Sequence, residues 1–276
     1  MIKQGDTIGV VALGGDCEKE KVDKAVLNLE NLGLKVKLAK NIYDQNKYLA
    51  GSDGGKLEAL YEFFQDPEIK LILNARGGYG SIRLINKIDY DIIKSNPKPF
   101  VGFSDITALL LMFYKKCGLI TYHGPMLCSD FADILEFTKN NFFSPPNKIV
   151  AEKVYKEGDT SGILWGGNLS TVASLCGQDF IPDEDFIFFT EDINEPVYKI
   201  DKMFTQLFNI EKFKNNCKAV VLGDFLGVDN NEWLESLFYE FEVPTIYVKG
   251  ITHSSKKITL PVGKSARLEN NCLIIK

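Results

Sequence analysis

Short apolar runs alternate with helix-like stretches over the first half of the chain. The run at residues 7–12 is β-branched and apolar, and Gly14-Gly15 follows it. Apolar residues then recur every three or four positions, at Val22, Ala25, Val26 and Leu29. Further strand-like runs lie at 36–38, 69–73, 98–103 and 119–122, and Ser52-Asp53 precedes a second helical stretch. This alternation predicts an α/β fold, a parallel sheet with helices on both faces.

The pattern changes after residue 130. Residues 130–158 are mostly polar and include Asn140-Asn141 and Pro145-Pro146. Short apolar runs then return with helical stretches between them, at Ile163–Leu164, Phe186–Thr190, Ala219–Leu222 and Thr245–Val248. We therefore predict an N-terminal α/β domain over 1–130, a linker over 131–160, and a smaller mixed α/β domain over 161–276.

Composition excludes several classes of protein. The 276 residues carry a formal net charge of -5 without a basic block, so a nucleic-acid surface is not expected. The chain has neither an apolar run that could cross a bilayer nor the apolar core of a signal peptide, and we expect a cytoplasmic protein away from membranes. Six cysteines are scattered singly, and the two histidines do not form a zinc-peptidase motif. No metal or cofactor is therefore expected.

Ser104 is the first candidate for chemistry. The apolar run 98–103 ends in Ser104-Asp105, and a helical pattern begins at once with Ile106, Leu109 and Leu110. A serine on such a strand–turn–helix junction projects its hydroxyl above the sheet, beside free N–H groups of the helix N-terminus. Ile106 replaces the second glycine of a full G-x-S-x-G motif. On this segment alone, an ordinary serine N-cap is the stronger interpretation.

A nucleophilic serine also needs a base, a carboxylate and an oxyanion site. His253 lies in a polar loop, and His123 ends a strand-like run, although either could be structural. Glu191-Asp192 follows the apolar run 186–190. The glycine-rich segment Arg76–Gly80 could present backbone N–H groups to an anion, which by itself is a weak signal.

Together, these segments resemble the LD-carboxypeptidase family over nearly the whole chain. The matching blocks occur in the family's order, and they are Arg76–Leu84, Gly102–Thr107, His123-Gly124-Pro125, Gly166–Leu169, Glu191–Asp201 and Gly250–Gly263. The chain departs from the family pattern at Lys202, where arginine is usual, and in the flanks of His253, which lack glycines.

The resemblance implies a flavodoxin-like first domain, a smaller mixed second domain and a homodimer. It implies a cytoplasmic serine hydrolase of cell-wall (peptidoglycan) recycling, which releases the terminal D-alanine of muropeptide tetrapeptides by cutting an L,D bond. By motif, the catalytic triad is Ser104, Glu191 and His253, and the N–H groups of Gly78 and Asp105 form the oxyanion hole. Arg76, Gly77, His123 and Asn168 are candidate substrate-binding residues, although Arg76 could equally make a structural ion pair.

Two alternatives stay open. A branch of the family gives immunity to a microcin-type peptide-nucleotide antibiotic by cutting an acyl-sulfamoyl or phosphoramidate-linked carboxamide. That branch usually has an extra aromatic loop, for which the segment 128–162 leaves little room. The chain could also be a catalytically silent α/β ligand-binding protein in which Ser104 is only a cap.

Overall fold

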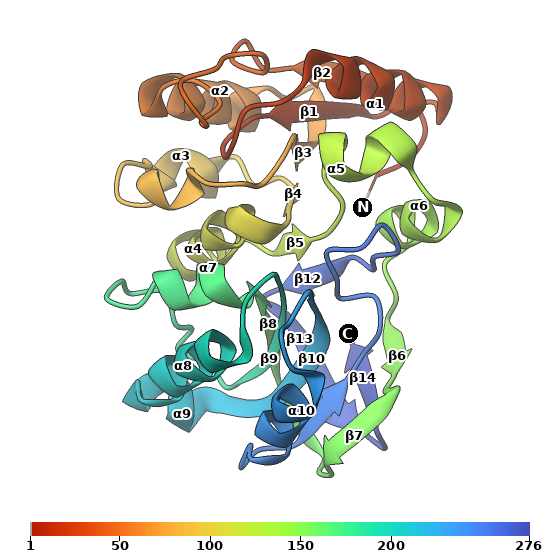
Figure 1. Cartoon of the computed structure of the whole chain (residues 1–276). Helices are drawn as coiled ribbons and strands as arrows, with labels where there is room; N and C mark the ends of the chain where they lie inside the picture. The colour runs from red at the N-terminus through yellow and green to blue at the C-terminus, as the bar shows by residue number, and fades with distance from the viewer. Residues whose placement is uncertain (1) are drawn as a thin grey trace. The chain divides into compact units, whose positions relative to one another are not determined.

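The computed structural model describes residues 2–276, and these divide into two units (Figure 1). The first unit extends to Pro145 and also includes Ile258–Leu260. The second contains Pro146–Lys257 and Pro261–Lys276.

The first unit is built around a sheet in the order β12-β5-β4-β3-β1-β2, and of its edge strand β12 only Leu260 belongs to this unit. Its strands are β1 (Thr7–Val11), β2 (Lys35–Leu38), β3 (Ile69–Asn74), β4 (Phe100–Gly102), β5 (Thr121–His123) and β12 (Leu260–Val262). Each neighbouring pair from β2 to β5 is parallel. The order 2-1-3-4-5 is that of flavodoxin-like folds, so the predicted fold class is confirmed.

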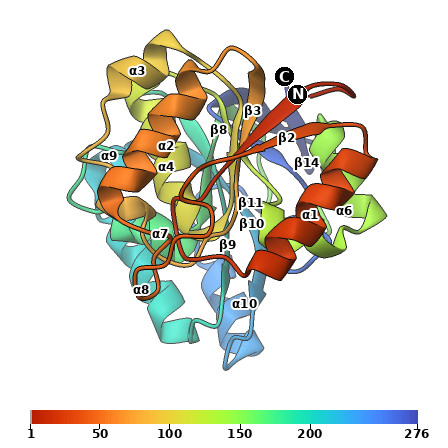
Figure 2. The ribbon, with the colours of Figure 1, turned by 90° about the horizontal axis from the view of Figure 1, so that it is seen from above.

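Helices cover both faces of this sheet, as the apolar pattern predicts. They are α1 (Lys19–Asn31), α2 (Asp53–Gln65), α3 (Tyr90–Ser95), α4 (Thr107–Cys117), α5 (Leu127–Asp130) and α6 (Glu136–Phe143). Figure 2 shows α2, α3 and α4 on one side of β3, with α1 and α6 on the other. The apolar stripe of α1 packs with β1, with Leu127 of α5 and with Phe131 after it. On the other face, Phe64 of α2 stacks on Phe100 of β4, and Phe100 meets Phe113 of α4 edge to face. Burial of apolar side chains on both faces holds the strand ends in fixed positions.

The second unit contains a mixed sheet in the order β6-β14-β13-β8-β9-β10-β11-β7. Its strands are β6 (Lys148–Val150), β7 (Lys153–Lys156), β8 (Thr160–Asn168), β9 (Phe186–Ile193), β10 (Cys217–Leu226), β11 (Thr245–Tyr247), β13 (Lys264–Glu269) and β14 (Cys272–Ile275). Its helices are α7 (Leu169–Ser174), α8 (Val197–Phe208), α9 (Glu211–Asn216) and α10 (Asn231–Tyr239). Strands β8 to β11 are parallel, and antiparallel strands extend the sheet at both edges.

The segment 131–160, expected to be a linker, is structured. It contains α6, β6 and β7, and the division between the units falls after Pro145. Its polar composition is misleading because α6 buries only Thr138 and Phe142, while β6 and β7 are edge strands. Such elements expose most of their side chains, so their sequence looks like that of a loop.

Candidate active site

Ser104 lies on a strained turn at the carboxyl end of β4. It begins the 3₁₀ turn Ser104–Ile106, which leads directly into α4. Its φ of 57° is in the left-handed region, which is uncommon for a residue with a Cβ. The N-cap position of α4 is Ile106, so Ser104 does not cap that helix. A serine held in this conformation between a strand and a helix has the geometry of a nucleophile elbow.

Two glycines make this turn possible. A Cβ on Gly102 would lie 2.2 Å from the Ile106 side chain. Ile106 stands at the last position of the G-x-S-x-G motif, where glycine is usual, and its buried side chain fits there only because residue 102 is glycine. A Cβ on Gly77 would lie 3.0 Å from the Ser104 Cβ and 3.4 Å from its Oγ. The glycine loop after β3 therefore passes directly beside the serine hydroxyl.

Gly78 is placed in the same loop with a φ of 90°. Its N–H makes no hydrogen bond to another described residue, which leaves this donor available for an anion. Backbone N–H groups that lie near a nucleophile stabilise negative charge as it develops on a substrate oxygen.

The Asp105 side chain connects the elbow to the glycine loop. Its Oδ2 accepts a hydrogen bond from the Ser81 N–H at 2.9 Å, and its backbone carbonyl accepts one from the Ser81 hydroxyl. Burial raises the pKa of Asp105, and the hydrogen bonds from Ser81 oppose that shift. The side chain therefore positions the loop, whereas the predicted oxyanion role concerns only the Asp105 backbone.

Arg76 makes a contact within the same group of loops. Its Nη1 donates to the Asp16 carbonyl at 2.9 Å and lies 3.9 Å from an Asp16 carboxylate oxygen. The side chain is still 49% exposed. The ion pair is long and solvated, which makes its contribution to stability small. This contact leaves the predicted binding role of Arg76 open.

His123 is buried at the end of β5. Its ring packs against Phe103 with the centroids 4.3 Å apart, and residue 123 pairs with Gly102 in the sheet. Aromatic packing of this kind supports the strand that carries Ser104. Its role in substrate binding stays a prediction.

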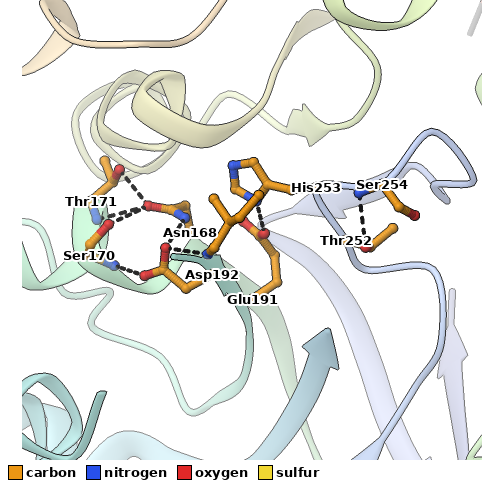
Figure 3. A network of polar contacts seen from close by, with 9 residues as sticks. Asn168, Ser170, Thr171, Glu191, Asp192, Thr252, His253 and Ser254 are labelled. Carbon is orange, nitrogen blue, oxygen red and sulfur yellow. Dashed lines mark hydrogen bonds and ion pairs between the residues drawn. The ribbon is translucent and has the colours of Figure 1, made fainter. Parts of the chain in front are cut away.

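The second unit brings Glu191 and His253 together (Figure 3). Glu191 belongs to β9 and is completely buried, and His253 lies in the loop after β11. The Glu191 Oε2 is hydrogen-bonded to the His253 Nδ1. A carboxylate on Nδ1 fixes the ring orientation and keeps Nε2 as the nitrogen that exchanges a proton with substrate or nucleophile.

Burial strongly affects the Glu191 carboxyl. Desolvation raises its pKa, whereas the hydrogen bond and charge of His253 lower it. The carboxylate is thus costly to ionise in isolation and depends on its partner imidazole. In a catalytic pair of this kind, the negative charge of the acid and the positive charge of the protonated histidine stabilise each other.

Asn168 and Asp192 form a network beside this pair (Figure 3). The Asn168 Nδ2 donates to an Asp192 oxygen at 2.9 Å, and its Oδ1 caps α7 by accepting the Thr171 N–H at 3.1 Å. Asp192 also accepts the Ser170 N–H at 2.8 Å. These contacts give Asn168 a supporting position next to Glu191, and its predicted substrate contact stays a prediction.

Three groups packed around these loops carried no prediction from the sequence: Lys56, whose Nζ donates to the Gly14 carbonyl at 2.9 Å, Gly14 itself, and the Asp105 side chain. Lys56 had a detectable signal, because it occupies the apolar stripe of α2 with Leu60 and Phe63. Gly14 had no such signal in the sequence, because what restricts it to glycine is the close approach of Gly77, a residue distant in sequence.

Among residues 2–276, no group of three or more histidine, cysteine or acidic side chains could hold a metal ion. No helix in that range is long and apolar enough to span a membrane.

Comparison with known proteins identifies the family. The model of the LD-carboxypeptidase N-terminal domain matches residues 8–124, and the model of its C-terminal domain matches residues 161–268. The chain is 35% identical to the probable murein peptide carboxypeptidase of Bacillus subtilis, over 97% of this chain and 90% of that protein.

Solved structures agree with this result. An MccF-like protein from Bacillus anthracis superposes with a TM-score of 0.89 at 28% identity, covering 99% of this chain and 97% of the other. The muramoyltetrapeptide carboxypeptidase from Oxalobacter formigenes gives 0.86 at 28% identity, covering 98% of both chains. The chain therefore belongs to the LD-carboxypeptidase family of serine peptidases.

Proposed function

We propose that this protein hydrolyses the L,D peptide bond that holds the terminal D-alanine of murein tetrapeptides, as part of cell-wall recycling. The strained Ser104 elbow beside the Gly77-Gly78 loop carries the proposal, because it combines a nucleophile with backbone donors. The names of two relatives, a murein peptide carboxypeptidase and a muramoyltetrapeptide carboxypeptidase, supply the substrate class.

In the proposed acylation step, His253 Nε2 takes the proton of the Ser104 hydroxyl while Oγ attacks the carbonyl carbon before D-alanine. The carbonyl electrons move to the oxygen, which the N–H groups of Gly78 and Asp105 bind. When the intermediate collapses, the C–N bond breaks and His253 returns the proton to the amine of D-alanine. Glu191 stabilises the imidazolium throughout.

Water completes the cycle. His253 removes a proton from water, and the hydroxide attacks the acyl carbon. The bond between the acyl carbon and the Ser104 Oγ then breaks, and His253 returns the proton to Oγ.

The free carboxylate of the substrate needs a partner, because an uncompensated charge in a closed site is costly. Arg76 is the proposed partner, since half of its guanidinium side chain is still exposed beside the glycine loop.

Incubation with a tetrapeptide ending in D-alanine, analysed by mass spectrometry, tests this proposal. The wild-type protein should release one D-alanine, and Ser104→Ala should keep its fold and lose several orders of magnitude in kcat. The pentapeptide, the amidated tetrapeptide and the all-L analogue should be poor substrates. Comparable kcat/KM on the amidated or all-L peptide would reject the assignment.

The second candidate function is microcin-type immunity, which the similarity to an MccF-like protein favours. An aminoacyl sulfamoyl adenosine in the same assay separates the two, because an immunity peptidase would cut it faster than the tetrapeptide. A fluorophosphonate probe tests the silent ligand-binding alternative, since only an activated serine is labelled.

Cytoplasmic location and a homodimer are also part of the proposal. Cell fractionation and light scattering of the purified protein test them.

A further inference from the structure

Lys56 is fully buried in α2, which is rare for a lysine. Its Nζ donates to the Gly14 carbonyl at 2.9 Å, so its hydrogen-bond partner is backbone and not a carboxylate. Burial lowers the pKa of Lys56, and the negative charges of Asp53 and Asp105 oppose that shift. A methionine would fill the same volume without the cost of burying a charge. The lysine therefore needs an explanation beyond packing.

The Nζ atom occupies the corner between two glycine loops. A Cβ on Gly80 would lie 2.8 Å from Nζ and 3.3 Å from the Gly14 carbonyl oxygen. The Gly15 N–H donates to the Gly77 carbonyl at 2.7 Å, and a Cβ on Gly14 would lie 2.4 Å from that same oxygen. Lys56 thus contacts the Gly14-Gly15 loop directly, and its Nζ lies so near the Arg76–Gly80 loop that residue 80 has no room for a side chain.

The second loop needs anchors, because its own backbone is unusually free. Gly78 and Gly80 have φ values of 90° and 140°, and glycine loses more conformational freedom on ordering than other residues. Asp105 and Ser81 fix one end of the loop to the elbow. The Gly15–Gly77 hydrogen bond fixes the other end, and Lys56 holds the loop that supplies it.

We propose that Lys56 is a positioning residue for the oxyanion site: by holding the Gly14 carbonyl, it fixes the loop that presents the Gly78 N–H beside Ser104. This inference rests on the proposed function of Ser104. It predicts that loss of the ammonium group lowers transition-state stabilisation and leaves ground-state substrate binding intact, because the oxyanion forms only during reaction.

Lys98 provides a matched control. Lys98 is partly buried, whereas Lys56 is fully buried, and burial lowers the pKa of both. The Lys98 Nζ donates to two backbone carbonyls at the C-terminal end of α2, those of Phe63 at 3.2 Å and Asp66. It lies before β4, at the opposite end of that strand from Ser104. Lys56→Met and Lys98→Met therefore remove the same kind of bond from the same helix, near and far from the elbow.

Steady-state kinetics on the tetrapeptide and the rate of fluorophosphonate labelling are measured on the full chain, with thermal unfolding as a check of folding. We expect Lys56→Met to lower kcat and the labelling rate about 10- to 100-fold with KM within about threefold, since complete loss of an oxyanion donor costs about 10²–10³. Lys98→Met should keep kcat within about twofold. A Lys56→Met protein with wild-type kcat, or an equal loss in Lys98→Met, would overturn the inference.

Ser81→Ala keeps the test decisive if Lys56→Met does not fold. It removes one hydroxyl from the other anchor of the loop, and it should lower kcat about 3- to 10-fold at unchanged KM. If Lys56→Met is unfolded, wild-type kcat in Ser81→Ala would overturn the inference. A failure of the proposed function looks different: the wild type would label but not cut the tetrapeptide, and the labelling rates would still test Lys56.

Discussion

The two regions that carry the proposed triad are built by different physical means. Around Ser104, the geometry comes from backbone: a left-handed φ, glycines in van der Waals contact and loop hydrogen bonds. Around Glu191 and His253, it comes from side chains: a buried carboxylate, an imidazole and a network of amide and hydroxyl groups. The first region excludes most substitutions sterically, whereas the second depends on charge and protonation.

This difference determines how each region should fail. A change beside Ser104 should displace the elbow or its loop, with an effect that depends little on pH. A change beside Glu191 should alter ionisation, with an effect on stability that varies with pH. The predictions below use that contrast, beginning with the largest expected effect.

The two histidines separate chemistry from packing. His253→Ala removes the proposed base and should lower kcat by about 10⁴-fold or more, because members of a triad act as a unit. His123→Ala removes a ring packed on Phe103 and should destabilise the protein by about 1–3 kcal/mol, with kcat within about tenfold. Kinetics and urea unfolding of both variants make the comparison. The assignment of the base fails if the two kinetic effects are reversed.

Glu191→Gln should separate activity from stability. Activity should fall by about 10²–10⁴-fold, because the amide no longer stabilises an imidazolium. Burial raises the pKa of Glu191 in the folded protein, so between its ordinary value of 4.5 and the raised value the folded state binds more protons than the unfolded state. Stability therefore falls as pH rises through that window.

The glutamine variant lacks this titration. Unfolding free energies of the two proteins should agree below pH 4.5, and at neutral pH the variant should be the more stable. Urea titrations at both pH values measure this. A variant that is less stable at neutral pH would mean that the ion pair with His253 outweighs desolvation.

The elements that sequence patterns predicted are those whose signal is local. Periodicity located β1, α1 and α2, and α2 begins directly after Ser52, whose side chain caps the helix by accepting the Gly55 N–H at 3.1 Å. Alternation predicted the parallel sheet, and the family resemblance supplied its flavodoxin-like order. The α6 to β7 segment was mistaken for a linker because edge elements bury little.

The parts of the site that could not be predicted depend on contacts between distant residues. Nothing near Gly14 in sequence shows that the Gly77 carbonyl lies against it, and nothing near Asp105 shows that its side chain accepts from Ser81. The left-handed φ of Ser104 is likewise a result of tertiary packing. Motifs identify such residues by type, whereas their physical role becomes visible only in the folded chain.

Gly14→Ala tests the backbone character of the nucleophile region. The new Cβ would lie 2.4 Å from the Gly77 carbonyl oxygen, so one of the glycine loops must move. We expect a loss of about 1–3 kcal/mol in unfolding free energy and at least about tenfold in kcat. Gly54→Ala is the control, because its Cβ would meet only the Ser52 Oγ at 4.0 Å in the first turn of α2.

Gly54→Ala should raise the unfolding free energy by about 0.4–1 kcal/mol and leave kcat unchanged, since alanine restricts the unfolded chain. Urea unfolding and tetrapeptide kinetics measure both effects. Equal behaviour of the two variants would show that the contact between the loops does not constrain the elbow.

The smallest effect is the strain at Ser104 itself, and it is best measured in proteins that are already inactive. Ser104→Ala keeps a Cβ at a φ of 57°, whereas Ser104→Gly removes it. The left-handed conformation costs an L-residue about 1–2 kcal/mol, and glycine gives back about 0.4–1 kcal/mol through the entropy of the unfolded chain. Ser104→Gly should therefore be more stable than Ser104→Ala by about 0.5–1 kcal/mol.

Glu58, an exposed residue inside α2, is the control position. There the order should reverse, and the glycine variant should be less stable than the alanine variant by about 1 kcal/mol. If glycine is the less stable residue at both positions, the turn at Ser104 is not strained in solution, and the contrast between a backbone-built nucleophile and a side-chain-built base would lose its main support.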